Sequence, residues 1–179
     1  EKILTHYEPF YSAPRSGTAE VYLHEMPGGQ YTNLKEQANG MGLGHRWQEI
    51  AHTYADVNQL FGDIVKVTPS SKVVGDMTML LVTQDLKAKD LLNGNAPNLD
   101  FPESVIDMLG GGLGQPDGGW PKQIQKLVLG DKIPVTVRPG ELAPPCDLDQ
   151  TKAELSQQLD REANNDDLYS HLMYPQVFS

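Results

Sequence analysis

Three hydroxyl groups and two ammonium groups lie within residues 66–72, whose sequence is Lys-Val-Thr-Pro-Ser-Ser-Lys. Proline has a φ angle close to the helical value and lacks the N–H group that the first residue of a helix leaves unpaired. The pattern therefore predicts that Thr68 is the N-cap of a helix and that Pro69 is its first residue. Residues 70–72 would then form the first helical turn.

This predicted helix start has two interpretations. Unpaired backbone N–H groups and the positive end of the helix dipole make such a turn suitable for a polar or anionic ligand. Alternatively, Thr68 serves only to cap the helix. From the local pattern alone, the cap is the favoured interpretation.

The composition limits the classes of protein to which the chain can belong. A chain of 179 residues can form one domain with a real core, or one domain with an extension. The net charge of −10 argues against general binding to nucleic acids or membrane surfaces, and no apolar run approaches the ~20 residues that cross a bilayer. Cys146 is the single cysteine, so we expect no internal disulfide and a reducing compartment.

The ends of the sequence led to one expectation about its origin. It begins with Glu1 rather than Met, and its last residues, 173–179, are largely apolar. We expect the chain to be a piece of a longer protein.

Apolar residues at helical spacing dominate the chain and predict a mainly α fold with short extended straps. An apolar stripe predicts a strong helix over residues 45–61, with Gly62 as its C′ residue. Residues 21–26 are expected to be a short strand or extended segment. Shorter or weaker patterns predict further helices over residues 31–40, 69–84, 85–93, 101–109, 123–129, 149–161 (with Asp149 or Thr151 as cap) and 166–173.

The glycine-rich stretch of residues 110–121 has the composition of a phosphate-binding loop, but not its pattern. The element before it is helical, and the lysine of the GxxxxGK[ST] motif is missing. We therefore expect a tight turn that packs Trp120 onto the helices.

Several segments together resemble the C-terminal half of the carboxyltransferase region of the pyruvate carboxylase family. The same region occurs in the oxaloacetate decarboxylase α subunit and the transcarboxylase large subunit. The similarity runs from about Val21 to Phe178, and Gln30-Tyr31 resembles the pyruvate carboxylase branch. The segments that carry it are residues 25–34, 42–44, 58–63, 66–76, 101–105, 114–121 and 173–175.

The resemblance implies a domain organisation. Residues 1–20 would be a strap leading from an upstream (α/β)8 barrel. Residues 21–132 would be the helical domain that forms a funnel over the mouth of that barrel. Residues 133–179 would be an extended strap with terminal helices that leads toward the next domain.

The resemblance also implies a reaction and roles for three residues. In the family, carboxybiotin on a carrier domain gives its carboxyl group to pyruvate and forms oxaloacetate. The threonine of this motif shuttles a proton between biotin and the pyruvate methyl group, which makes Thr68 the catalytic candidate. The serine and lysine that follow bind biotin, and these positions are Ser71 and Lys72. A hydroxyl both donates and accepts a hydrogen bond, so it can relay a proton without holding a charge.

Other parts of the implied enzyme would lie outside this sequence. The family's divalent metal is held by the upstream barrel, ATP is used by a separate domain, and biotin is attached to the carrier domain. We assign no metal ligand in this chain and expect it to be inactive alone. The complete enzyme would be a homotetramer in the cytoplasm, or in the mitochondrial matrix of a higher eukaryote, with no nucleic-acid or membrane partner.

Two alternatives stay open at this point. The chain could be the equivalent segment of an oxaloacetate decarboxylase α subunit, which runs related chemistry toward decarboxylation. It could also be a non-catalytic helical interaction module that kept the fold without the chemistry.

Overall fold

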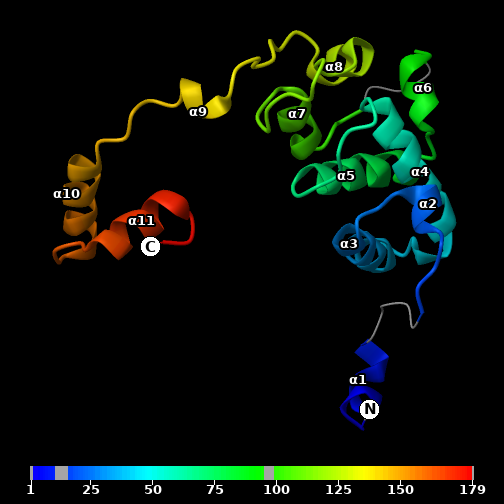
Figure 1. The fold of residues 1–179 in the computed structure, drawn as a ribbon, viewed down its shortest axis with the longest axis horizontal. Helices are drawn as coiled ribbons and strands as arrows, with labels where there is room; N and C mark the ends of the chain where they lie inside the picture. The colour runs from blue at the N-terminus through cyan, green and yellow to red at the C-terminus, as the bar shows by residue number, and fades with distance from the viewer. Residues whose placement is uncertain (1, 11–15, 95–98, 179) are drawn as a thin grey trace. The chain divides into compact units, whose positions relative to one another are not determined.

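The computed structural model describes residues 2–10, 16–94 and 99–178, and within these ranges every regular element is a helix (Figure 1). The mainly α prediction is therefore confirmed. The α-helices are α1 (Lys2–Tyr7), α2 (Val21–His24), α3 (Gly28–Gly40), α4 (Trp47–Leu60), α5 (Ser70–Thr83), α6 (Ala88–Leu92), α7 (Glu103–Leu109), α8 (Lys122–Leu129), α9 (Pro139–Leu142), α10 (Leu148–Leu159) and α11 (Asn165–Met173), and two 3-10 turns are η1 (Glu8–Phe10) and η2 (Gly44–Arg46).

The expectation of an extended segment at residues 21–26 is wrong, because Val21–His24 forms the single helical turn α2. The N–H group of Glu25 closes this turn on the carbonyl of Val21 at 2.7 Å. Glu25 has a left-handed φ angle of 58°, which ends the helix at once. The apolar residues of this segment gave a strand-like composition, but the local backbone hydrogen bonds determine the conformation.

The chain divides into two compact units, residues 1–141 and 142–179. In the second unit, Leu155, Ala163 and Leu168 are buried between α10 and α11. The cap of α10 is Asp147, rather than the predicted Asp149 or Thr151, and its carboxylate accepts the N–H of Gln150 at 2.9 Å.

The N-terminus of α11 is stabilised by a reciprocal capping box. The side chains of Asn164 and Asp167 each accept the other residue's backbone N–H. The Arg161 guanidinium, at 2.6 Å, lowers the pKa of Asp167 to about 2, so this carboxylate is charged at neutral pH.

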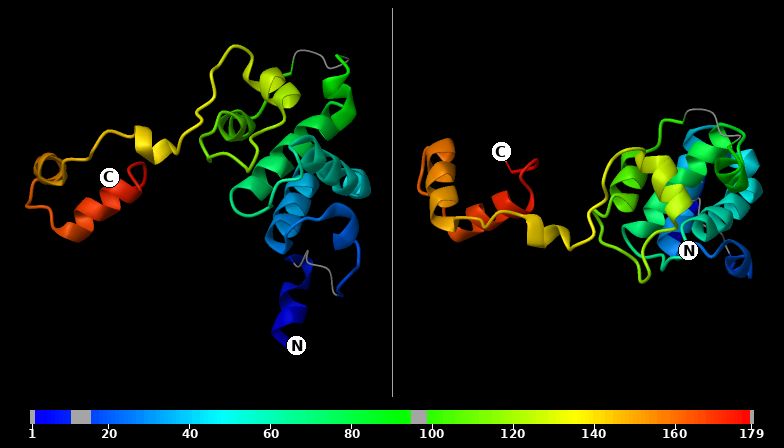
Figure 2. Two further views of the ribbon diagram at one scale, coloured as in Figure 1. Left: turned by 45° about the horizontal axis from the view of Figure 1, so that its top comes forward. Right: turned by 90° about the horizontal axis from the view of Figure 1, so that it is seen from above.

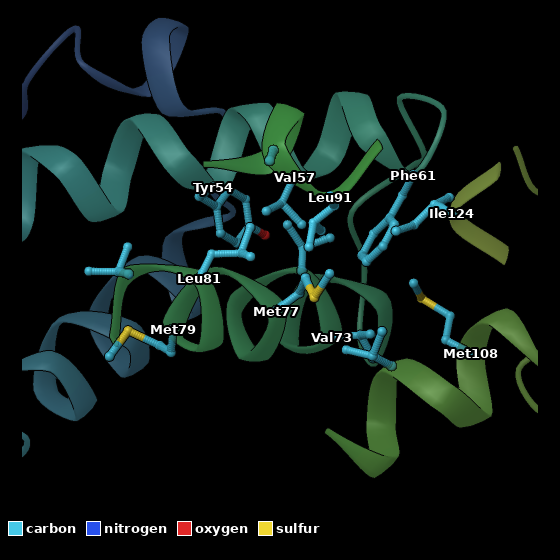
Figure 3. Close-up of a cluster of buried hydrophobic side chains, with 14 of the residues drawn as sticks. Tyr54, Val57, Phe61, Val73, Met77, Met79, Leu81, Leu91, Met108 and Ile124 are labelled. Atoms are coloured by element: carbon cyan, nitrogen blue, oxygen red, sulfur yellow. The ribbon is translucent and has the colours of Figure 1, made fainter. Parts of the chain in front are cut away.

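The core of the first unit is built around α4 and α5, which lie side by side in both views of Figure 2. Figure 3 shows Tyr54 and Val57 of α4, and Phe61 directly after it, directed toward α5, and all three are fully buried. Gly62 follows α4 with a φ angle of 94°, as the sequence predicted for its C′ residue. The other helices of this unit add buried side chains around the pair, among them Leu34, Leu91, Val105, Met108 and Ile124.

One buried hydrogen bond joins the middle of α4 to the first turn of α5. The hydroxyl of Tyr54 donates to the carbonyl oxygen of Ser71 at 3.1 Å, and Tyr54 has no exposed surface. Burial raises the pKa of Tyr54, so the hydroxyl stays protonated and available as a donor. The bond fixes the start of α5 against α4 at the segment that carries the candidate site.

We expect Tyr54→Phe to loosen the start of α5. The change removes one buried hydrogen bond without opening a large cavity, and such a bond contributes about 1 kcal/mol. Because α5 keeps its apolar contacts, the fold should survive. Amide hydrogen exchange of the α5 peptides should be about fivefold faster, which corresponds to that free energy.

The matched control is Tyr22→Phe, which removes a hydroxyl from an exposed tyrosine. Unchanged exchange in Tyr54→Phe, or equal acceleration in both variants, would show that the Tyr54 bond does not hold the helix start.

Candidate functional site

A groove of about 350 Å³ lies beside the junction between α4 and α5. One wall is the segment that joins the two helices, and the opposite wall is the glycine-rich turn with the end of α7. The groove is lined by Ile64, Val65, Val67, Thr68, Pro69, Ser70, Met108, Leu113, Gly114, Gln115, Pro116, Asp117 and Trp120. The expectation that the glycine-rich turn packs Trp120 onto the helices is confirmed, since Trp120 belongs to the buried core.

Thr68 lies in this groove with an exposed side chain. Among the described residues, no hydrogen bond involves its hydroxyl, so the group is available both to donate and to accept. The peptide bond between Thr68 and Pro69 is cis.

The prediction that Thr68 caps α5 is wrong. The helix begins at Ser70, Pro69 occupies the cap position, and no side chain makes a capping hydrogen bond there. The loop is held instead by the hydroxyl of Ser70, which accepts the N–H of Val67 at 3.1 Å and lies 2.9 Å from the carbonyl oxygen of Val65. Ser70 performs the local structural role, and the Thr68 hydroxyl is left free.

Two of the N–H groups expected to be open at this helix start are paired within the chain. The N–H of Ser71 is bonded to the carbonyl of Val67 at 3.2 Å, and the N–H of Lys72 to that of Pro69 at 3.0 Å. The loop folds back so that its own carbonyls satisfy these donors. A ligand at this junction would therefore meet side chains and few open backbone amides.

Ser71 lies in the first turn of α5 but does not line the groove with Thr68. Only 6% of its surface is exposed, and its carbonyl accepts the Tyr54 hydrogen bond. Thr68 and Ser71 are thus close in sequence, but Thr68 lines the groove and Ser71 is buried.

Lys72 is directed along α5 and binds Asp76, one turn further on. Its ammonium lies 2.5 Å from Asp76 Oδ2, and the same oxygen accepts the hydroxyl of Ser104 at 2.6 Å. Ser104 belongs to α7, so this cluster links the two helices. Like Ser71, Lys72 is not among the residues that line the groove.

Lys66, the other lysine of the motif, anchors the loop at its opposite end. Its ammonium lies 2.9 Å from a carboxylate oxygen of Glu25, just after α2. Only 12% of the Lys66 side chain is exposed, so this pair is more sheltered than an ordinary surface ion pair. The segment that carries Thr68 is thus held by Lys66 before it and by Ser70 after it.

Sequence reasoning missed Asp76, Ser104 and the residues that form the groove's far wall. Asp76 carried a usable signal, because it follows Lys72 at the i+4 spacing of a helical ion pair. Ser104 and Gln115 lie in segments that resemble the family, but no local pattern predicts that the packing of α7 and the glycine-rich turn brings them to the junction.

No metal site is found in the part of the chain that the structure describes, where no three His, Cys, Asp or Glu residues are grouped as ligands. Among the described helices, none is long and apolar enough to cross a membrane. Cys146 is exposed and unpaired with another cysteine.

Comparison with known proteins gives the family. Residues 21–179 match the family described as the conserved carboxylase domain. The whole chain is 48% identical to pyruvate carboxylase of Bacillus subtilis, of which it spans 16%. Over 92% of its length, it is 43% identical to human mitochondrial pyruvate carboxylase, of which the match covers 14%.

A solved structure gives the corresponding region. The carboxyl transferase domain of Rhizobium etli pyruvate carboxylase, solved with pyruvate and biocytin, superposes with a TM-score of 0.86 at 52% identity. The match covers 98% of this chain and 29% of that one. The chain therefore belongs to the conserved carboxylase domain family and corresponds to the C-terminal part of the carboxyltransferase region of pyruvate carboxylases.

Proposed function

We propose that this chain forms part of a carboxyltransferase site, where the carboxyl group of carboxybiotin is transferred to pyruvate to give oxaloacetate. The observation that carries the proposal is the unpartnered hydroxyl of Thr68, exposed in a groove on a loop anchored at both ends. Both relatives named above are called pyruvate carboxylase, which supports carboxylation of pyruvate as the physiological direction.

The groove suits the head group of biotin, a compact bicycle with an apolar sulfur ring and a polar ureido ring. Val65, Val67 and Leu113 offer exposed apolar surface, while Thr68 and Gln115 offer hydrogen-bonding groups. A mostly apolar pocket with few polar groups is the usual form of a cofactor site. Because the chain spans 16% of its Bacillus relative, other walls of the site would come from elsewhere in the enzyme.

The proposed role of Thr68 is proton relay at its Oγ1 atom. Biotin, when bound, supplies the activated carboxyl group. Pyruvate must lose a methyl proton as its methyl carbon forms the new C–C bond, and the ureido ring must gain a proton. Thr68 can accept the first proton while it donates its own, so the hydroxyl never holds a net charge.

Ser71 and Lys72 are the proposed biotin-binding residues; neither lines the groove, and both assignments rest on the motif that the chain shares with the family. The Lys72 ammonium has three N–H donors and shares one with Asp76, which leaves donors for a ureido oxygen. Such charge-assisted hydrogen bonds are stronger than neutral ones. Ser71 is the more enclosed of the two.

The remaining parts of the enzyme belong to the same proposal. An upstream barrel would hold the divalent metal and pyruvate, a carrier domain would deliver biotin, and a separate domain would use ATP. We infer a homotetrameric enzyme in a reducing compartment, either the cytoplasm or, as the name of the human relative says of that protein, the mitochondrion.

Thr68→Ala in the protein encoded by the complete gene should abolish oxaloacetate formation. Loss of a positioned proton-transfer group lowers the rate by about 10² to 10⁴-fold. ATP-dependent carboxylation of biotin uses another site, so it should stay within about twofold of the wild-type rate. The two half-reactions are assayed separately.

Thr68→Ser, which keeps the hydroxyl, is the matched control and should retain most of the activity. If Thr68→Ala made oxaloacetate at the wild-type rate, the proton-relay role would be wrong. If both half-reactions failed together, the variant would have lost its fold rather than its relay.

Lys72→Gln should weaken biotin binding in the carboxyl-transfer half-reaction. This half-reaction can be run backward, from oxaloacetate with free biotin as the carboxyl acceptor. Losing a charge-assisted hydrogen bond should raise the KM for biotin about tenfold or more, with little change in the KM for oxaloacetate. An unchanged KM for biotin would contradict the assignment of Lys72.

A further inference from the structure

We propose that Asp76 is a positioning residue that acts through Lys72, and that Ser104 of α7 orients Asp76. This inference rests on the proposed function, since it concerns the lysine assigned there to biotin. It adds two residues to which the resemblance assigned no role, and it links the proposed biotin-binding lysine to the interface between α5 and α7.

The two partners of the ion pair between Lys72 and Asp76 differ in exposure. The Lys72 side chain is 67% exposed, whereas that of Asp76 is only 16% exposed. Asp76 Oδ2 is held from two directions, by the ammonium of Lys72 and by the hydroxyl of Ser104. The carboxylate is therefore the fixed partner, and it limits the positions that a long, mobile lysine can occupy.

The pair of Lys72 and Asp76 is poorly placed to stabilise the helix. Lys72 is the third residue of α5, where the helix dipole disfavours a positive charge. The order of the two charges is also the weaker one, because Lys72 precedes Asp76. An i,i+4 pair stabilises a helix better when the acidic residue lies nearer the N-terminus. Because the pair goes against both the helix dipole and the favoured order of charges, we attribute it to function rather than to helix stability.

Helix α7 connects this cluster to the groove. Ser104 and Met108 are four residues apart on α7 and so lie on one face of that helix. Met108 lines the groove that contains Thr68, while Ser104 binds Asp76. One helix face thus contacts both the proposed relay site and the carboxylate that holds Lys72.

The chemical consequence is preorganisation of the ammonium. A free lysine side chain populates many rotamers, and fixing it on binding costs conformational entropy. Asp76 binds one N–H of Lys72 in advance and leaves the other two for a ligand. Asp76 itself does not touch biotin in this proposal, so its effect should be seen in binding and should depend on Lys72.

The test uses the complete enzyme and the reverse half-reaction with free biotin as the acceptor. Asp76→Asn keeps an oxygen for Ser104 but removes the charge that holds Lys72. We expect the KM for biotin to rise about fivefold, with kcat at saturating biotin within about twofold of wild type. The double variant Lys72→Gln/Asp76→Asn should match Lys72→Gln alone, because the carboxylate has no role without the lysine.

Substitution of Ser104 gives a second test of the same cluster, with a smaller expected effect. Ser104→Ala should raise the KM for biotin about twofold to threefold, and Ser104→Thr should restore it, since the hydroxyl is kept. The matched control is Asp85→Asn, which neutralises the carboxylate bound at 2.7 Å by Arg46, away from Lys72. It should leave the KM for biotin unchanged.

The outcomes separate this inference from the proposed function. If Lys72→Gln raises the KM for biotin while Asp76→Asn and Ser104→Ala do not, the positioning role is overturned and the biotin role of Lys72 stands. If Asp76→Asn raises the KM for biotin further in the Lys72→Gln background, the role of Asp76 is structural, and the inference is again wrong. If Lys72→Gln itself leaves the KM unchanged, the biotin role of Lys72 fails and the inference fails with it.

Discussion

The candidate site depends on the packing of α4 against α5 and on the hydrogen bond from Tyr54 to Ser71 within that interface. Apolar burial brings the two helices together but is non-directional and does not by itself fix their register. The Tyr54 hydroxyl adds direction, because it meets one carbonyl in the first turn of α5. Thr68, Ser71 and Lys72 all lie within four residues of that carbonyl, so this contact fixes the helix start around which their own contacts are made.

The Ser70 hydroxyl makes the local structural hydrogen bonds, which leaves the neighbouring Thr68 hydroxyl, the proposed catalytic group, free. A threonine that caps a helix uses its oxygen as an acceptor, which would compete with proton relay at the same atom. Ser70 instead makes the local hydrogen bonds to Val65 and Val67. The conflict between capping and catalysis is thereby resolved, and the loop stays ordered while Thr68 remains available to a ligand.

The sequence predicted the helices with strong periodicity, and the resemblance of its motifs indicated the family, which the comparisons confirmed. Prediction was weaker where short-range hydrogen bonds compete. The apolar residues 21–26 suggested extension, yet a single turn closes between Val21 and Glu25. Thr68 was expected to be the cap because the rules for helix starts cannot tell which of three adjacent hydroxyls will be used. Ser104 reaches Asp76 only through the packing of α7 on α5, and no local pattern encodes that contact.

The most direct test of the account is a crystal structure of the complete protein with pyruvate and biocytin bound. We expect the biotin head group to lie in the groove beside α5, with Thr68 Oγ1 about 2.6–3.2 Å from a nitrogen or oxygen atom of the ureido ring. The same oxygen should lie about 3–3.5 Å from the pyruvate methyl carbon. We also expect that Lys72 keeps its contact with Asp76 while it donates to the ureido oxygen. A head group bound elsewhere, or a Thr68 hydroxyl beyond hydrogen-bond reach of it, would contradict the central claim.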